Sequence, residues 1–260
     1  GLGGRTVLSL AVGGLIMAGS LYSMQSKAAE GAVQIPPPAV DEPAGSGMET
    51  AVIAGGCFWG VQGVFQHVKG VKSAVSGYSG GTTANPSYDD VVTETTGHAE
   101  SVKITFDPQQ VSYGRLLQIF FSVVADPTTL NYQGNDHGTS YRSALFTMSD
   151  AQKKVAAAYV AQLDAAKVYP ARIVTEVTPY TNFYQAEDYH QDNATTLNVN
   201  ASYVSYFDLP KIANLKVMFP DSAPALPPDG CVRSTIAVSS RIKLAMLTVA
   251  AVFMRSSPPV

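Results

Sequence analysis

In the first half of the central region, residues 48–220, segments with the hydrophobic spacing of a strand alternate with segments that have the spacing of a helix. Residues 50–55 form a short apolar run, which predicts a buried strand. Residues 58–68 then place apolar side chains every three or four positions, which predicts a helix. Apolar and polar residues alternate over 102–106, as is typical of a strand, and residues 112–124 carry leucines and phenylalanines on one helical face. The pattern therefore begins strand, helix, strand, helix.

The second half of this region continues with both spacings. The pattern predicts a strand over 141–148 and a helix over 149–167. A second strand is predicted over 172–177, and a final helix from Glu187 onward. Ser149 followed by Gln152 is typical of a capping box at the start of the first of these helices. The turns between the elements are long and irregular, so the pattern predicts an α+β fold: a compact two-layer mixed β-sheet with packed helices.

The N-terminal part differs from the rest in composition. Residues 6–23 are uncharged and mostly apolar, Arg5 precedes them, and Ser26–Ala28 resembles a cleavage site between small residues. We expect residues 1–29 to be a signal peptide or an N-terminal anchor, the alternative being a buried core helix. The protein is then exported, periplasmic or membrane-anchored, facing outside the cytosol. Residues 30–47 are rich in proline and glycine, which predicts an extended linker.

A second group of prolines marks the other boundary of the central region. Four prolines lie within 220–228, so we expect one domain over 48–220 and a separate tail over 221–260. The tail contains an apolar stretch at Leu244–Met254, which is too short to span a membrane unaided. The sequence assigns no role to this tail.

Composition excludes several classes of protein. The chain of 260 residues is 46% hydrophobic, which argues against a disordered chain. It carries 17 Lys and Arg against 20 Asp and Glu, which argues against a basic nucleic-acid binder. Two cysteines cannot form a disulfide framework, and with four scattered histidines they offer no closed zinc site. We therefore expect a packed globular domain that needs no metal or cofactor.

The sharpest local signal is the segment Gly55–Gly60, which reads Gly-Gly-Cys-Phe-Trp-Gly. It falls between the first predicted strand and helix, where the two glycines allow a tight turn. Cys57 then lies at the start of a helix, where the helix dipole lowers a thiol pKa and favours a nucleophile. Phe58 and Trp59 are expected to line an apolar pocket. The alternative is a buried structural cysteine beside two core aromatic residues.

This segment resembles the active-site motif of the A-type peptide methionine sulfoxide reductases. The resemblance continues in order along the chain, at Gly55–Gly60, Gly77–Gly81, Asn85–Tyr88, Thr96–Glu100, Gln133–Ser143 and Ala186–Gln191. It covers about residues 48–220. It implies a compact α+β domain with a ferredoxin-like core, which agrees with the predicted element order. It also implies that the S epimer of methionine sulfoxide, free or in oxidised proteins and peptides, is reduced to methionine.

The resemblance assigns roles to individual residues. Cys57 matches the nucleophile, and Glu100 matches the acid that protonates the sulfoxide oxygen. Such an acid must keep its proton at neutral pH, so Glu100 is expected to be buried with a raised pKa. Tyr88 and Tyr141 match the phenols that form hydrogen bonds with the sulfoxide oxygen. Asp136 matches a carboxylate that helps to order the site. The matched aromatic pair, Phe58 and Trp59, is expected to hold the methyl group of the substrate.

The same resemblance implies that Cys57 becomes a sulfenic acid, which a second thiol must reduce. The other cysteine, Cys231, lies in the tail and outside the matched region. Either Cys231 resolves Cys57, or thioredoxin or a thioredoxin-like dithiol attacks the sulfenic acid directly; we favour the direct route. We expect the protein to act as a monomer.

Other readings of the motifs are weaker. Residues 77–81 also fit the G-x-S-x-G elbow of serine hydrolases, but the residues that follow oppose the required helix. His98–Glu100 fits the H-x-E of zinc deaminases, whose P-C-x-x-C partner is absent from the sequence. Two rivals stay open at this point. One is a Cys-dependent hydrolase that uses Cys57 with His190, and the other is a non-catalytic exported binding domain.

Overall fold

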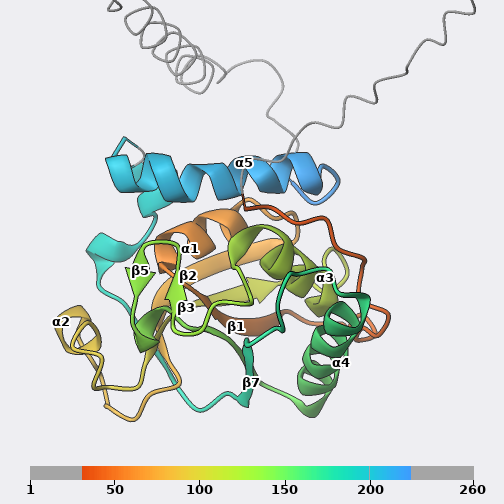
Figure 1. Cartoon of the computed structure of the whole chain (residues 1–260), viewed down its shortest axis with the longest axis horizontal. Helices are drawn as coiled ribbons and strands as arrows, with labels where there is room; N and C mark the ends of the chain where they lie inside the picture. The colour runs from red at the N-terminus through yellow and green to blue at the C-terminus, as the bar shows by residue number, and fades with distance from the viewer. Residues whose placement is uncertain (1–30, 199, 224–260) are drawn as a thin grey trace, which may run out of the picture.

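The computed structural model of the protein describes residues 31–198 and 200–223 (Figure 1). Six strands form one mixed sheet in the order β7-β6-β1-β3-β2-β8. Their bounds are β1 (Glu49–Gly55), β2 (Val71–Ser79), β3 (Ala99–Phe106), β6 (Ser143–Thr147), β7 (Glu176–Pro179) and β8 (Phe183–Gln185). Within this sheet, β6 and β7 pair in parallel, and the other neighbouring strands pair antiparallel. A separate hairpin joins β4 (Tyr132–Gln133) to β5 (Asp136–His137).

The helices lie between these strands and after them. The α-helices are α1 (Phe58–Gln66), α2 (Tyr88–Val91), α3 (Tyr113–Ile119), α4 (Asp150–Ala166) and α5 (Leu209–Met218). Shorter 3-10 or π-helical turns are η1 (Phe120–Val124), η2 (Thr139–Tyr141), η3 (Asp188–His190), η4 (Asn193–Leu197) and η5 (Val204–Asp208). The run β1-α1-β2-β3-α3-β6, with spatial order β6-β1-β3-β2, is the ferredoxin-like arrangement. The expected α+β fold with this core is therefore confirmed.

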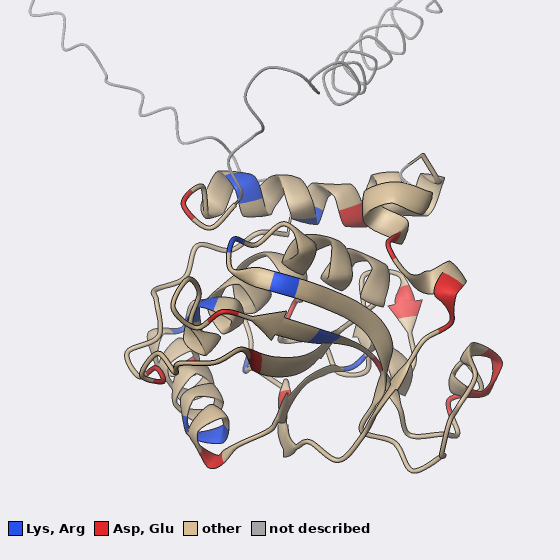
Figure 2. Cartoon of the chain, turned by 180° about the vertical axis from the view of Figure 1, so that it is seen from behind, with Lys and Arg blue, Asp and Glu red and all other residues tan. Residues whose placement is uncertain are grey.

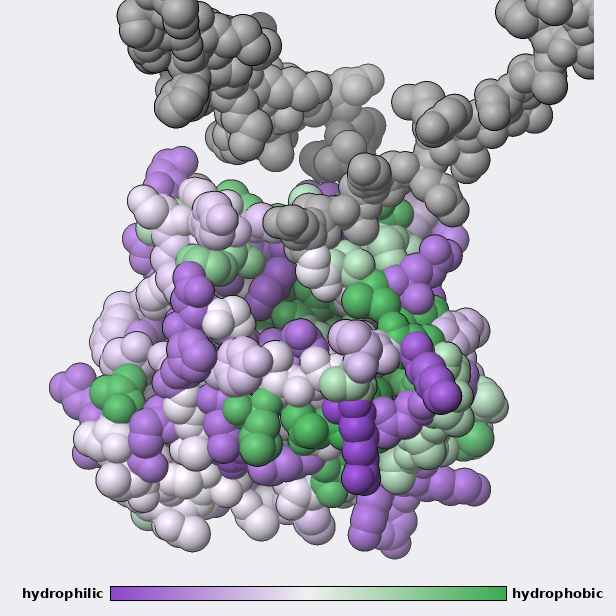
Figure 3. Space-filling model, viewed as in Figure 1, coloured by the Kyte–Doolittle hydropathy of each residue, from purple (hydrophilic) through white to green (hydrophobic). Residues whose placement is uncertain are grey.

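Helix α1 lies between the sheet and α5, as Figure 1 shows. Its apolar residues Val61, Val64 and Phe65 are buried, as their helical spacing predicts. Helix α4 packs against α3 and against the β6–β7 side of the sheet. In Figure 3, which has the same view as Figure 1, hydrophobic residues gather below α5, and Figure 2 shows Lys and Arg scattered over several elements. The helices thus bury one face of the sheet and support the end of β1 from which α1 begins.

Several predicted elements are confirmed with small shifts at their ends. The helix predicted over 112–124 forms as α3 followed directly by η1. Helix α4 begins after Ser149, whose Oγ accepts the Gln152 N–H at 3.0 Å. The capping box is incomplete, because the Gln152 side chain accepts the N–H of Met148 instead of that of Ser149. The second hydrogen bond of the motif is therefore made by Met148, the residue before Ser149.

Two predicted elements near the C-terminus are wrong in extent. The strand predicted over 172–177 begins only at Glu176 and continues to Pro179. The helix predicted from Glu187 onward is replaced by η3, η4 and η5, and regular α-helix returns only in α5. Asp192 has a left-handed backbone with φ 59°, which a continuous α-helix cannot contain.

Strand β2 is absent from the sequence prediction. Its residues 71–79 include three serines and a glycine, which give no clear alternation. A Cβ on Gly77 would lie 2.4 Å from the Tyr184 carbonyl oxygen and from the Phe183 ring, so the neighbouring strand β8 requires a glycine here. Pairing with β3 along its length and with β8 at Gly77–Ser79, and not hydrophobic spacing, explains this strand.

The segments predicted to flank the domain make contacts with it. Ile35 is buried, and its carbonyl accepts a hydrogen bond from the Gln118 side chain. Tyr159 donates its hydroxyl to the carbonyl of Pro36. At the other end, the carbonyl of Ser222 accepts the Lys69 N–H at 2.6 Å. Residues 33–41 form no helix or strand and bend at residues 39 and 40, and they pack on α3 and α4 instead of standing clear of the domain.

The predicted signal or anchor over 1–29, Cys231 and the stretch Leu244–Met254 lie outside the described residues. Among residues 31–198 and 200–223, no helix has the length and hydrophobicity needed to cross a membrane.

Candidate functional site

The turn from β1 into α1 places Cys57 as the residue immediately before the helix. Gly56 has a positive φ of 87°, and a Cβ there would lie 2.6 Å from the Cβ of Gln133. A Cβ on Gly55 would lie 2.7 Å from the Phe120 ring. Both glycines are thus required by close packing, and the predicted tight turn before a helix is confirmed.

The electrostatic setting of Cys57 differs from the expectation. Burial raises the pKa of the thiol well above its ordinary value, and the nearby carboxyl groups of Glu100 and Asp208 raise it further. The hydrogen bonds that Cys57 forms with the Trp59 backbone and with the Tyr203 hydroxyl lower its pKa, but by less than burial raises it. The prediction of a lowered pKa was therefore wrong, because desolvation outweighs the helix N-terminus. Cys57 is a neutral thiol at neutral pH before substrate binds.

Glu100 lies on β3, next to the start of α1, and only 2% of it is exposed. Its Oε2 accepts the backbone N–H of Phe58 at 2.9 Å. Burial raises the pKa of Glu100 to about 8, the Phe58 N–H lowers it, and the charges of Asp136, Asp208 and Glu94 raise it. Glu100 therefore carries a proton at neutral pH, as its predicted role as an acid requires.

Two phenols face this carboxylic acid from separate loops. Tyr88 is the first residue of α2, whose start is fixed by a complete capping box between Ser87 and Asp90. Tyr141 is the last residue of η2 and forms a side-chain hydrogen bond with Tyr88. Burial raises the pKa of both phenols, and Glu100 raises each further, so both stay protonated donors. The structure brings together these two predicted residues.

Asp136 reaches the site through a residue that the sequence did not indicate. Asp136 lies on β5 and accepts the hydroxyl hydrogen of Tyr203, which comes from the segment before η5. Tyr203 also forms a hydrogen bond with Cys57 and stands edge-on to Trp59, with ring centroids 5.9 Å apart. Tyr203 is one of 13 tyrosines and lies outside the recognised motifs, so no sequence signal could have selected it.

The two aromatic residues after Cys57 occupy different positions. Phe58 is only 1% exposed and packs against Tyr78 and His190 in the core. Trp59 is half-buried, and its Nε1–H donates to His190 Nδ1 at 3.3 Å. Of the predicted pair, therefore, Trp59 presents surface beside Cys57, whereas Phe58 supports the site from the core.

The motif at 186–191 holds the site together from the C-terminal side. Glu187 accepts the backbone N–H of Tyr88 with one oxygen and the hydroxyl of Tyr78 with the other. His190 lies against the ring of Tyr88, with centroids 4.5 Å apart, and Gln191 bonds to both backbone groups of Ser76. These residues position Tyr88 and Trp59.

His98, the residue two before Glu100, has a structural role. Its Nδ1 accepts the Gly81 N–H at 3.1 Å, and its Nε2 lies 2.8 Å from the Thr83 carbonyl. Both ring nitrogens are therefore used to fix the loop after β2. Over the described residues, no group of three or more His, Cys, Asp or Glu side chains is arranged to hold a metal ion.

Asp208 is a second residue that sequence analysis missed. It is fully buried, and neither carboxylate oxygen has a hydrogen-bond partner among the described residues. A Cβ on Gly60 would lie 2.4 Å from its Oδ1, so Asp208 packs on the first turn of α1. Burial raises the pKa of Asp208 to about 7, although the charge of Lys211 lowers it. Only the packing of η5 on α1 brings this carboxyl group near Cys57.

A partly exposed thiol beside a protonated carboxylic acid and two phenols defines a cysteine-dependent enzyme that delivers protons to its substrate. The family model described as peptide methionine sulfoxide reductase matches residues 49–221. The chain belongs to the A-type family of these reductases, and it is an oxidoreductase.

Individual relatives agree with this assignment. A peptide methionine sulfoxide reductase MsrA 2 of Mesorhizobium japonicum is 59% identical over 181 residues, which cover 70% of this chain and 92% of that protein. An MsrA of Polynucleobacter asymbioticus is 49% identical, over 66% of this chain and 90% of the relative.

Solved structures show the same fold. Reduced Mxr1 of Saccharomyces cerevisiae matches with a TM-score of 0.53 and 30% identity, over 63% of this chain and 92% of that one. Methionine sulfoxide reductase A of Corynebacterium diphtheriae matches with a TM-score of 0.50 and 34% identity, over 64% and 86%. These findings do not favour the hydrolase or the binding domain.

Proposed function

We propose that this chain reduces the S epimer of methionine sulfoxide, free or in proteins, to methionine at Cys57. The observation that carries the proposal is the protonated Glu100, buried at the start of α1 beside the thiol, with a pKa of about 8. A sulfoxide has an electrophilic sulfur and a basic oxygen, so its reduction needs a nucleophile and a proton donor together. Cys57 and Glu100 supply this pair.

The proposed first step conserves atoms and electrons within the enzyme and substrate. Glu100 donates its proton to the sulfoxide oxygen, which makes the substrate sulfur more electrophilic. Cys57 Sγ attacks that sulfur while the thiol proton returns to the Glu100 carboxylate. The oxygen then passes to Cys57 Sγ as a hydroxyl group, which leaves methionine and a Cys57 sulfenic acid. The substrate gains two electrons and Cys57 loses two.

The remaining residues of the site have proposed roles in binding. The hydroxyls of Tyr88 and Tyr141 are protonated donors facing Glu100, and we assign them to the sulfoxide oxygen. Asp136 holds Tyr203, and Tyr203 orients the Cys57 thiol. Trp59 provides the apolar wall against the methyl group of the substrate, with Phe58 behind it.

The substrate and stereochemistry are tested with the full chain and dithiothreitol as reductant. The separate S and R epimers of methionine sulfoxide are supplied, both free and within a short peptide. We expect turnover of the S epimer alone. Turnover of an ester or amide without reduction of either epimer would contradict the proposal in favour of a hydrolase.

Replacement of Trp59 by alanine is expected to weaken substrate binding. Loss of a half-buried apolar wall corresponds to about 1–3 kcal/mol, which raises KM for a peptide sulfoxide by roughly five- to 160-fold. Steady-state kinetics measure KM, and thermal melting checks that the domain still folds. Tyr206→Ala, which removes an aromatic side chain that is 75% exposed, is the matched control and should leave KM unchanged. An unchanged KM in Trp59→Ala would remove Trp59 from the binding site.

Recycling completes the proposed cycle. A thiolate of thioredoxin, or of a thioredoxin-like dithiol protein, attacks the sulfenic acid and releases water, which forms a mixed disulfide with Cys57. The second thiol of the partner then releases Cys57 as a thiol and leaves the partner as a disulfide. With residues 1–29 as an export signal or anchor, this partner works outside the cytosol.

The reach of the tail does not by itself exclude Cys231 as a resolving thiol. Ser222 is bonded to Lys69, just after α1, at the end of that helix opposite Cys57. A nine-residue helix is about 14 Å long, and the chain from residue 223 to Cys231 can extend to about 28 Å. We nevertheless favour direct reduction, because Cys231 lies outside the region matched by the family model.

Replacement of Cys231 by serine is therefore expected to leave at least about half of the thioredoxin-driven turnover. A separate reaction with one equivalent of sulfoxide and no reductant should convert Cys57 to sulfenic acid in both proteins, as mass spectrometry can establish. A Cys57–Cys231 disulfide in the wild type, with multiple turnovers abolished in Cys231→Ser, would show instead that the tail takes part in recycling.

A further inference from the structure

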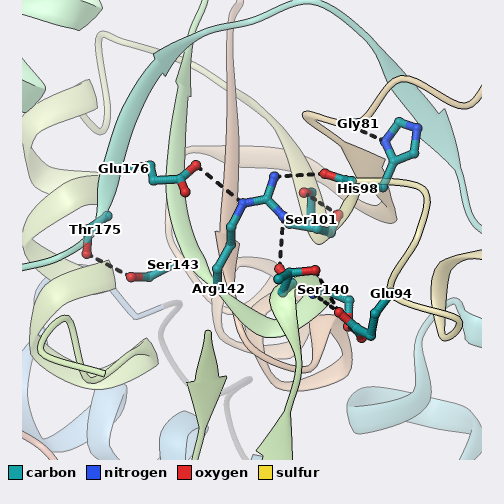
Figure 4. A network of polar contacts seen from close by, with 12 residues as sticks. Gly81, Glu94, His98, Ser101, Ser140, Arg142, Ser143, Thr175 and Glu176 are labelled. Carbon is teal, nitrogen blue, oxygen red and sulfur yellow. Dashed lines mark hydrogen bonds and ion pairs between the residues drawn. The ribbon is translucent and has the colours of Figure 1, made fainter. Parts of the chain in front are cut away.

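The carboxylate of Glu94 holds the turn that carries Tyr141. One oxygen accepts the Thr139 hydroxyl at 2.7 Å and the Ser140 backbone N–H at 2.9 Å. The other oxygen accepts the Ser140 hydroxyl at 2.6 Å. Figure 4 shows the Glu94 side chain directed at Ser140 from a different loop. Three donors on two consecutive residues are thus fixed by one side chain from outside the turn.

The backbone of Glu94 indicates that this side chain has a specific task. Its φ is 62°, in the left-handed region that favours glycine, yet a glutamate stands there. The carboxylate also lies against Gly138, where an added Cβ would come within 2.4 Å of Oε1. The strained backbone is offset by the three hydrogen bonds, so the clamp and the conformation depend on each other.

A second clamp fixes the same turn from its other side. Arg142 donates Nη1–H to the Thr139 carbonyl at 2.9 Å and Nη2–H to the Gly97 carbonyl at 3.0 Å. Its Nε lies 3.3 Å from a carboxylate oxygen of Glu176 (Figure 4). Because Gly97 lies three residues before Glu100, the two clamps tie the phenol-bearing turn to the loop that leads into the acid.

The segment held in this way contains two groups of the proposed site. Asp136, on β5, precedes the turn, and Tyr141 ends it. The turn itself is a short 3-10 helix in which the Tyr141 N–H donates to the Gly138 carbonyl at 3.1 Å. One such bond cannot by itself fix where the Tyr141 side chain points. Tyr88 forms a hydrogen bond with the Tyr141 side chain, and the contacts from Glu94 and Arg142 fix the backbone that carries it.

We propose that Glu94 is a positioning residue that holds the Tyr141 hydroxyl where it can donate to the sulfoxide oxygen. The inference rests on the proposed function of Tyr141 in the same site. Burial raises the pKa of Glu94, but the hydrogen bonds from Ser140 and Thr139 bring it below its ordinary value, so the carboxylate is ionised and accepts strongly. Glu94 does not itself touch the substrate, and the effect of its charge, which raises the pKa of Glu100, is smaller than the effects of Asp136 and Asp208.

The test compares three substitutions at Glu94 in the full chain, with the S epimer and dithiothreitol. Glu94→Ala and Glu94→Gly should each lower kcat/KM about tenfold, the scale of one well-placed hydrogen bond. Glu94→Gln can still accept from Ser140 and should stay within about threefold of the wild type. Glycine suits the left-handed backbone, so Glu94→Gly should lose activity without a lower melting temperature than Glu94→Ala.

A double-mutant cycle separates positioning from general structure. In a Tyr141→Phe background the hydroxyl is absent, so Glu94→Ala should cost less than about twofold. Asp150→Ala, which removes an exposed carboxylate on α4, is the control and should not change kcat/KM.

Three results would overturn the proposal: an unimpaired Glu94→Ala, a Glu94→Gln that falls as far as the alanine variant, or an undiminished loss in the Tyr141→Phe background. A wild type that does not reduce the sulfoxide would instead refute the proposed function.

Discussion

Cys57→Ser is expected to reduce sulfoxide turnover by at least about a thousandfold, the largest effect of any substitution in this chain. A serine hydroxyl is a much weaker nucleophile than a thiol and does not form the sulfenic acid that the cycle requires. The fold should be retained, because serine is a favourable residue immediately before a helix and its hydroxyl can accept the Trp59 backbone N–H that Cys57 accepts. The measurement is a single-turnover rate with one equivalent of the S epimer.

The chain contains its own matched control for this substitution. Cys231→Ser makes the same chemical change in the tail and should leave the single-turnover rate at the wild-type value. Circular dichroism of both variants checks the fold. A Cys57→Ser protein that still reduces the sulfoxide in a single turnover would remove Cys57 from the reaction, whatever the behaviour of Cys231.

Glu100→Gln is expected to slow the reduction by about 100-fold or more, the usual scale for loss of a general acid. Glutamine keeps the size of the side chain and can still accept the Phe58 N–H, so the start of α1 should keep its geometry. Single-turnover rates of the two proteins decide the matter, and equal rates would exclude Glu100 as the acid. Asp150→Asn, which alters an exposed carboxylate on α4 away from the site, is the control.

The pH dependence adds a second readout for Glu100. The wild-type rate should fall as pH rises through about 8, where Glu100 loses its proton, and the glutamine variant should lack this limb. Other groups near Glu100, namely Asp136, Asp208, Tyr88, Tyr141 and the Cys57 thiol, are common to both proteins. If the rate of both proteins falls in the same pH range, one of these other groups causes the fall.

Stability should respond to pH through the same group. The pKa of Glu100 is higher in the folded protein than its ordinary value of 4.5, so the folded state binds the proton more tightly. Stability is therefore lost as pH rises from about 4.5 to about 8. Glu100→Gln does not titrate, and urea unfolding at pH 6 and pH 9 should show that it loses less stability than the wild type. An equal loss in both proteins would mean that Glu100 is not buried as a neutral acid.

The sequence was sufficient wherever neighbours along the chain decide the structure. The apolar run at 50–55, the glycine pair and the helical spacing over 58–68 predict the strand, the turn and the helix that present Cys57. Ser149 predicts the start of α4 for the same reason, since a cap involves residues three positions apart. The motifs, in their order and spacing, also indicated the family and the residues that the structure brings together around Cys57.

The sequence was insufficient where distant segments decide the outcome. Strand β2 depends on its pairing with β3 and, at its end, with β8, and the segment after Glu187 turns at the left-handed Asp192. The pKa of Cys57 rises although the thiol stands at a helix start, because surrounding segments remove it from water. Such effects have no periodic signature in the sequence.

By itself, then, the sequence determined which local turn presents the thiol and indicated the residues to which the proposed chemistry is assigned. Only the tertiary structure decided the protonation states of Cys57 and Glu100, and only it revealed the contributions of Tyr203, Asp208 and Glu94. The physical reason is the range of the interactions. Turns, caps and helical spacing act within a few residues, whereas desolvation and side-chain hydrogen bonds act between segments that only the completed fold brings into contact.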